Sequence, residues 1–201
     1  MKRRKFVYAA GLSAISVSIF GHVVPTKKGA FTGDCETSND ILGPFYRADA
    51  PFKTDLTYAG MEGTVIDLKG VVYGADCSTP LSNALVEIWQ CNKHGEYDNN
   101  SNNFHLRGKC YADENGAYAF KTILPGKYLN GGKYRPAHIH FRVSAEDSRE
   151  LISQIYFQGD PLIAEDPWAS LEKAERRILP IALNDTKGNL SVVFDISLGA
   201  K

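Results

Sequence analysis

Apolar and polar residues alternate along several short segments of this chain. The alternation is clearest in ALVEIW (84–89) and AHIHFRV (137–143). Because successive side chains of a strand point to opposite faces, this pattern predicts strands with one face buried. Turn-forming stretches such as DENG and NDTKGN separate the segments. Strands are therefore predicted at 62–73, 83–91, 116–123, 137–144, 151–157 and 190–197.

One segment has a helical pattern, SLEKAERRIL at 170–179. Many short strands with regular turns are typical of two-layer β-proteins. The predicted fold class is all-β, an antiparallel β-sandwich with long loops and one short helix. The 201 residues, 43% of them hydrophobic, suffice for one packed domain. We expect this single catalytic domain to span residues 25–200.

The first 24 residues differ from the rest of the chain. The basic start MKRRK is followed by the apolar run FVYAAGLSAISVSIFG, which is the layout of a secretory signal peptide. The pair Arg3-Arg4 also resembles a twin-arginine signal. The leader predicts export to the periplasm or the medium. Because no small-x-small cleavage site stands out before Pro25, an uncleaved membrane anchor stays open.

Charge argues against nucleic acid as a partner. The chain has 23 basic and 23 acidic residues, and four of the basic residues lie in the leader. The remainder is therefore mildly acidic, and it lacks the basic stripe that binding to phosphates requires.

Four cysteines, an even number, suggest two disulfides in an exported chain. They are Cys35, Cys77, Cys91 and Cys110. The predicted strand between Cys77 and Cys91 would hold these two sulfurs too far apart to bond. We therefore favour pairing Cys35 with Cys77 and Cys91 with Cys110. Buried free thiols are the alternative.

Two of the five histidines lie two residues apart, in YRPAHIHF at 134–141. On a strand, His138 and His140 share one face, while Ile139 and Phe141 point to the other. Two imidazoles on one face of a rigid strand can form half of a metal site. Taken alone, the pair is a weak signal, because paired core or surface histidines are also common.

Two tyrosines close to turns strengthen the case for a metal. Tyr97 lies in GEYDNN and Tyr128 in PGKY. A phenol has a pKa of about 10, so only a strong Lewis acid ionises it at neutral pH. Phenolate oxygens are hard donors and favour a hard, highly charged cation. Two phenolates and two neutral imidazoles therefore suit ferric iron better than zinc, which is usually bound by thiolate, imidazole and carboxylate.

These residues resemble the intradiol ring-cleavage dioxygenases, the family of catechol and protocatechuate dioxygenases. The resemblance covers about residues 40–162, and the order and spacing of its motifs are more specific than any single one. The motifs are GPFYR (43–47), PLSNALVEIWQCNKHGEY (80–97), LRGKCYADENGAYAFKTILPGKY (106–128), YRPAHIHFRV (134–143) and QIYFQGDP (154–161). The family fold is a β-sandwich, which agrees with the pattern above.

The resemblance implies a function and a cofactor. It implies cleavage of a catechol by O2 between the two hydroxylated carbons, at a non-haem Fe(III) site, giving a cis,cis-muconate-type diacid. It also implies the small-molecule catechol and O2 as partners.

The resemblance further implies roles for individual residues. The metal ligands would be Tyr97, Tyr128, His138 and His140. Of these, Tyr128 would leave the metal when substrate binds and so take part in catalysis. Arg135 and Gln154 match the catalytic pair beside the substrate ring. The residues that would line the substrate pocket are Gly43, Pro44 and Tyr46.

Other questions stay open from the sequence. The loop LNGGKY at 129–134 lacks a tryptophan, so the choice of catechol is undetermined. The chain shows no long helical N-terminal region of the kind that catechol dioxygenases use to dimerise, and homo-oligomers are not excluded. A non-catalytic secreted β-sandwich binding module with an incidental HxH motif is the alternative from another class. A cupin-like metalloenzyme would need a third histidine, and none follows His140.

Overall fold

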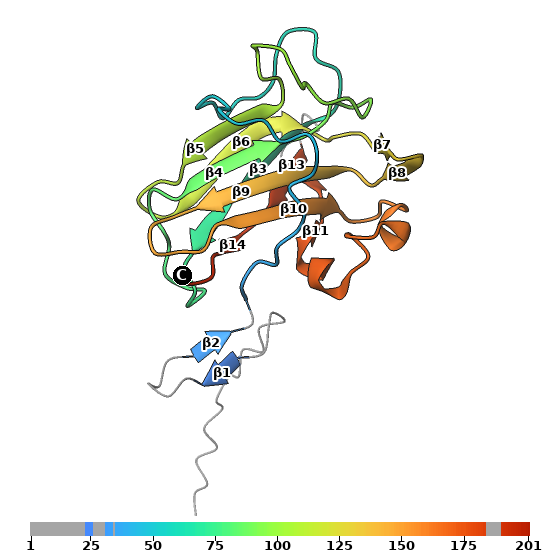
Figure 1. Cartoon of the computed structure of the whole chain (residues 1–201). Coiled ribbons are helices and arrows are strands. Elements are labelled where there is room, and N and C mark those ends of the chain that lie inside the picture. The colour runs from blue at the N-terminus through green and yellow to red at the C-terminus, as the bar shows by residue number, and fades with distance from the viewer. Residues whose placement is uncertain (1–22, 26–30, 34, 184–189) are drawn as a thin grey trace, which may run out of the picture.

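Two five-stranded sheets stack face to face in the computed structural model, which describes residues 23–25, 31–33, 35–183 and 190–201 (Figure 1). The first sheet has the order β11 (Ile178–Leu179), β10 (Leu151–Phe157), β9 (His138–Ser144), β4 (Leu85–Trp89) and β5 (Arg107–Tyr111). The second contains β12 (Ala182–Leu183), β13 (Leu190–Val193), β3 (Val65–Tyr73), β14 (Ile196–Ser197) and β6 (Ala117–Ile123).

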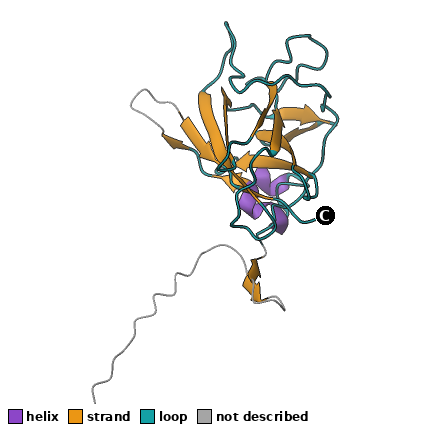
Figure 2. Ribbon diagram, turned by 90° about the vertical axis from the view of Figure 1, so that its left-hand side faces the viewer, coloured by secondary structure: helices purple, strands orange, loops and turns teal. Residues whose placement is uncertain are grey.

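Two hairpins and two 3-10 helices complete the described elements. The hairpins are β1 (Val23–Pro25) with β2 (Phe31–Gly33), and β7 (Tyr128–Asn130) with β8 (Lys133–Arg135). The helices are η1 (Ile163–Glu165) and η2 (Glu172–Arg177), and both lie on one side of the sandwich (Figure 2). The β-sandwich predicted from the sequence is confirmed.

The differences from the predicted elements have simple causes. The predicted strand 190–197 is two strands, β13 and β14, and each pairs parallel with β3. Strand β5 was not predicted, because its sequence RGKCY shows no apolar alternation. As the sheet edge, it has one neighbouring strand. The expected helix 170–179 is a 3-10 helix that stops at Arg177, since Ile178 and Leu179 pair with β10.

The core fills the space between the sheets. It includes Ile66 and Leu68 from β3, together with Ile139 and Phe141 from β9. Because Ile139 and Phe141 point into the core, the histidines between and beside them occupy the outer face of the first sheet. The predicted orientation of β9 is therefore confirmed.

Residues 36–46 cross this outer face and are here named the N-terminal strap. The strap is bonded along β10: the backbone N–H of Asp40 donates to the carbonyl of Ile152 at 2.8 Å, and the hydroxyl of Ser153 donates to the carbonyl of Ser38 at 2.9 Å. The strap contains no named helix or strand. The strap shields the polar face of β9 and β10 from solvent.

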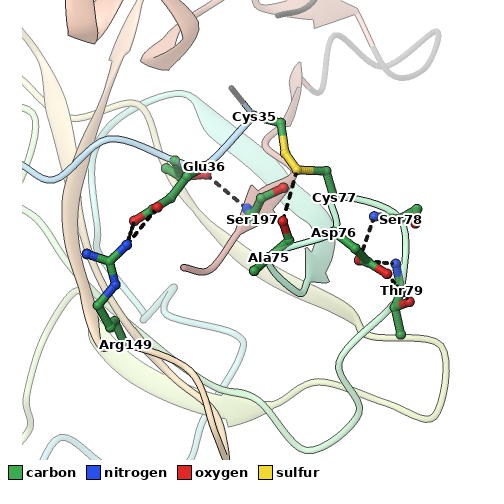
Figure 3. Close-up of a disulfide and its surroundings, with 10 residues drawn as sticks. Cys35, Glu36, Ala75, Asp76, Cys77, Ser78, Thr79, Arg149 and Ser197 are labelled. Carbon is green, nitrogen blue, oxygen red and sulfur yellow. Dashed lines mark hydrogen bonds and ion pairs between the residues drawn. A yellow bond between two sulfur atoms is a disulfide. The ribbon is translucent and has the colours of Figure 1, made fainter. Parts of the chain in front are cut away.

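A disulfide anchors the start of the strap (Figure 3). Cys35 is bonded to Cys77, with 6.2 Å between their Cα atoms, and Arg149 forms an ion pair with Glu36 at 2.8 Å. The predicted Cys35–Cys77 pair is confirmed. Because Cys77 belongs to the loop after β3, the bond ties the strap to the second sheet.

The predicted Cys91–Cys110 disulfide is wrong, and both thiols are free. The cause is strand register. Cys110 lies opposite Val86, and Cys91 lies five residues beyond Val86, a displacement of roughly 16 Å along a strand. The Cys91 thiol donates instead to the carbonyl of Gly126 at 3.2 Å.

The predicted leader falls almost wholly outside the described residues. Export, cleavage and the exact limits of the catalytic domain therefore stay predictions. Within the described ranges, no helix is both long and apolar enough to cross a membrane.

The loop between β4 and β5 is organised by Asp98. Its carboxylate accepts hydrogen bonds from the backbone N–H of Ser101 at 2.9 Å and of His105 at 2.8 Å. Its carbonyl accepts from Nε of Arg107 at 2.8 Å. Burial raises the pKa of Asp98, but the hydrogen bonds from Ser101 and His105 outweigh it and lower that pKa to about 2. The charged form of Asp98 therefore stabilises the segment that follows Tyr97.

This linkage predicts how the Asp98→Asn variant responds to acid. The pKa of Asp98 is lower in the folded than in the unfolded state, so the stabilisation is present above pH 4 and is lost as the pH falls towards 2. We expect the metal-free variant to be less stable than wild type by about 1–2 kcal/mol at neutral pH. Denaturant unfolding across a pH series should show the gap closing near pH 2. A gap that is constant from pH 7 to pH 2 would contradict the role of the charge.

Candidate active site

The two histidines of β9 lie side by side and are buried. Their ring centroids are 5.0 Å apart, and each residue is 1% exposed. Nδ1 of His138 lies 2.7 Å from the carbonyl of Pro136. Since a carbonyl only accepts, Nδ1 carries the proton and Nε2 keeps its lone pair. Trp89 stacks on His140 at 4.7 Å and 8°, which fixes the plane of that ring.

Burial keeps both imidazoles neutral. Burial, and then the charge of Arg135, lower the pKa of His138 to about 4. Burial and the neighbouring His138 hold the pKa of His140 well below its ordinary value. Neutral imidazole is the form that binds metals. Nδ1 of His140 is also buried without a hydrogen-bond partner among the described residues, which is costly unless another group satisfies it.

Two glycines bring the tyrosine segments together. Gly95 and Gly126 each precede a tyrosine by two residues, in GEY and GKY. A Cβ on Gly95 would collide with the carbonyl of Lys127, and a Cβ on Gly126 would collide with the carbonyl of Lys93. Glycine therefore permits the close backbone approach that sets Tyr97 and Tyr128 against each other.

Four rings from three segments converge at one point. The hydroxyl of Tyr97 lies 3.4 Å from Nε2 of His138. The Tyr97 and Tyr128 centroids are 5.6 Å apart, and Tyr128 is 5.4 Å from His138. Tyr97 is 6.3 Å from His140. The structure thus brings together all four residues that the sequence singled out as candidate ligands.

The chemistry of this donor set fits a hard, highly charged cation. Burial, and then the nearby Cys91 and Tyr128, raise the pKa of Tyr97 well above 10, so its phenol ionises only beside a strong positive charge. No group of three or more His, Cys, Asp or Glu side chains that could hold a metal occurs in the described part of the chain. A metal here would therefore take its remaining donors from the tyrosines, and the residues fit ferric iron.

Arg135 and Gln154 lie beside the rings. Strand register places Arg135 opposite Tyr128 and Gln154 opposite His140. Asp166 holds the guanidinium through Nε at 2.7 Å, and the Trp168 ring lies 4.3 Å from its central carbon. Nη1 of Arg135 is buried and has no hydrogen-bond partner among the described residues. One strong donor is therefore left free next to the four rings.

The residues of the GPFYR segment (43–47) have different surroundings. Gly43 passes directly over a histidine: a Cβ there would lie 3.0 Å from Cε1 of His140. Pro44 is exposed. Tyr46 packs on Trp89 with centroids 5.1 Å apart and accepts a hydrogen bond from Arg142 at 2.6 Å. The structure does not bring Tyr46 to the two tyrosines.

Phe45, which was not singled out from the sequence, contacts both candidate tyrosines. Its ring stacks on Tyr97 at 4.3 Å and 16°, and it meets the edge of Tyr128 at 5.5 Å. Arg107 donates to the Phe45 carbonyl at 2.6 Å and so fixes the segment. The GPFYR motif pointed to this segment as part of the substrate pocket, but no local pattern showed which of its side chains turns inward. No sequence pattern pointed to Asp166 or Trp168, which lie beyond the last family motif.

Most of this chain is similar to known proteins. The family model described as "Dioxygenase" matches residues 41–200. Catechol 1,2-dioxygenase of Acinetobacter baylyi is 36% identical over 81% of this chain and 62% of its own length. The protocatechuate 3,4-dioxygenase beta chain of Burkholderia cepacia is 36% identical over 81% of this chain and 79% of its own. The chain thus spans about three fifths of the catechol dioxygenase and more of the beta chain.

Solved structures share the fold. Catechol 1,2-dioxygenase from Acinetobacter sp. ADP1, inhibited by bound mercury, superposes with a TM-score of 0.71 and is 30% identical, over 82% of this chain and 63% of that one. The dioxygenase domain of a carbohydrate-binding fusion protein from Streptomyces sp. SirexAA-E gives 0.72 at 26% identity, over 83% of this chain and 99% of that one. The chain therefore belongs to the intradiol ring-cleavage dioxygenase family.

Proposed function

We propose that this chain cleaves a catechol-type aromatic diol with O2 in the intradiol manner at a non-haem Fe(III) site, giving a cis,cis-muconate-type diacid. The convergence of buried Tyr128, partly buried Tyr97 and two neutral histidines carries the proposal. Family membership supports the reaction class. The proposed ligands are Tyr97, Tyr128, His138 and His140. When bound, ferric iron supplies Lewis acidity and a template for both catechol oxygens.

Protein groups around the rings would move protons and stabilise charge. The phenolate oxygen of Tyr128 would accept one of the two protons that a catechol loses on binding. The free Nη1 donor of Arg135 would stabilise negative charge that develops on the substrate ring and its oxygens. Gln154, on the same face as His140, would orient the substrate. The strap, with Gly43 above His140, would exclude water.

We propose an uncarboxylated catechol as substrate. The two arginines nearest the Tyr97 loop are committed to that loop and to the strap. Arg107 donates to the carbonyls of Asp98 and Phe45, and Arg47 donates with both terminal nitrogens to the carbonyl of Ser101. Neither guanidinium offers the free fork that would bind a ring carboxylate.

The remaining parts of the proposal are those that the sequence suggested. O2 is the second substrate, and export through the leader is part of the proposal, as is a homo-oligomer. The alternative, a non-catalytic binding module, explains neither the unpartnered Nδ1 of His140 nor the free Nη1 of Arg135, because buried polar atoms normally have partners.

The proposal predicts the fate of molecular oxygen. The iron-reconstituted chain, supplied with catechol and isotopically labelled O2, should yield one diacid that carries both labelled atoms. Mass spectrometry of the product measures this. A ring-cleaved product lacking the label, a semialdehyde from cleavage outside the diol, or no product would each refute the proposed reaction. Protocatechuate, which carries a ring carboxylate, should be cleaved more slowly than catechol when the two are tested in parallel.

Removal of one proposed ligand should release iron. We expect His138→Ala to weaken iron binding by at least tenfold, since even groups that only support metal ligands contribute roughly 10- to 100-fold. The matched control is His94→Ala, because His94 is exposed and its Nε2 lies 3.4 Å from a carboxylate oxygen of the exposed Glu62. Metal analysis after dialysis measures the loss. Equal iron content in His138→Ala and the control would show that His138 is not a ligand.

A further inference from the structure

Two buried ion pairs lie next to the candidate catalytic residues. Arg135 pairs with Asp166 at 2.7 Å, and the two side chains are 3% and 1% exposed. Arg177 pairs with Asp40 at 2.6 Å, and both side chains are 1% exposed. Arg177 also donates to the backbone carbonyl of Gln154 at 2.6 Å. Four charges are thus buried on the outer side of β10.

One hydroxyl joins these pairs. Tyr156 Oη accepts a hydrogen bond from Nη2 of Arg135 at 3.1 Å. It lies 3.0 Å from a carboxylate oxygen of Asp40 and 3.2 Å from the side-chain oxygen of Gln154. Both of these oxygens accept, so the single Tyr156 proton is directed between them. The strap, β8 and β10 all meet at this oxygen.

Buried ion pairs contribute little net stability to a fold. A buried ion pair costs much of its attraction in lost hydration, and apolar side chains of similar volume often stabilise a fold equally well. Two such pairs are therefore poorly explained by stability alone. What they do provide is a fixed direction for each polar group, since a satisfied buried network is rigid.

We propose that Tyr156 is a positioning residue whose hydroxyl fixes both Arg135 and Gln154 for the reaction. This inference rests on the proposed function. Tyr156 faces the site because it lies opposite His138 on the paired strand, two residues from Gln154. Its hydroxyl holds Nη2 of Arg135, which leaves Nη1 as the donor free to meet the substrate.

The orientation of Gln154 follows from the same junction. Its amide nitrogen donates to the strap carbonyl of Ile41 at 2.9 Å, and its amide oxygen faces the Tyr156 hydroxyl. Without the hydroxyl, this oxygen loses its donor and Nη2 of Arg135 loses an acceptor. Both side chains would then be held by fewer bonds, although the fold around them is unchanged.

The test compares Tyr156→Phe with Tyr118→Phe in the full chain. Tyr118 is also buried, and its hydroxyl donates one hydrogen bond, to the carbonyl of Phe194 at 2.6 Å. It lies on β6 in the second sheet, away from the candidate site. Each substitution removes one buried hydroxyl, so the control variant accounts for lost stability. Thermal unfolding of both metal-free variants measures that loss.

Two readouts separate positioning from stability. In the metal-free proteins, NMR of the Arg135 guanidinium and of the Gln154 side-chain amide should show faster hydrogen exchange in Tyr156→Phe alone. In the iron-loaded proteins, kcat for catechol should fall roughly 10- to 100-fold in Tyr156→Phe, with a smaller change in KM. Tyr118→Phe should keep the wild-type kcat. Arg135 and Gln154 signals that match those of Tyr118→Phe would overturn the proposal.

The NMR readout also separates this inference from the proposed function. A wild-type chain that binds iron but does not cleave catechol would contradict the function, while the metal-free comparison would still decide the role of Tyr156. If Tyr156→Phe does not fold, Asp40→Asn replaces it, because that change keeps the size of the side chain and removes the charge that faces the Tyr156 proton and pairs with Arg177. Unchanged Arg135 and Gln154 signals in Asp40→Asn would equally overturn the proposal.

Discussion

The site depends on one constraint: polar side chains on the outer face of β9 and β10 are buried and need partners. Alternation along β9 sends Ile139 and Phe141 into the core and leaves His138 and His140 outside it. Without a cover over the outer face of the first sheet, these imidazoles would be exposed to water. The N-terminal strap covers them, and the disulfide at Cys35 holds one end of that strap to the second sheet. Two neutral, oriented imidazoles result.

Convergence of the remaining groups follows from backbone geometry. Close approach at Gly95 and Gly126 sets Tyr97 against Tyr128, and the β7–β8 register sets Tyr128 opposite Arg135. Each group therefore comes from a segment whose path is fixed before any ligand is bound. A site built in this way is preorganised, so little binding energy is needed to order it.

Sequence patterns predicted what depends on local periodicity. Most of the longer strands, the shared face of His138 and His140 and the grouping of the tyrosine segments followed from alternation, turn residues and family motifs. Features set by tertiary contacts were missed. The inward turn of Phe45 and the partnership of Asp166 with Arg135 leave no periodic trace, and the register that separates Cys91 from Cys110 cannot be read from spacing.

The central claim is that two tyrosines and two histidines hold ferric iron and bind catechol directly. The visible spectrum of the iron-reconstituted full chain, recorded before and after catechol is added without O2, tests it most directly. Charge transfer from phenolate to ferric iron should give a red protein whose band moves to longer wavelength with catechol. A colourless protein that nonetheless contains stoichiometric iron would contradict the role of Tyr97 and Tyr128.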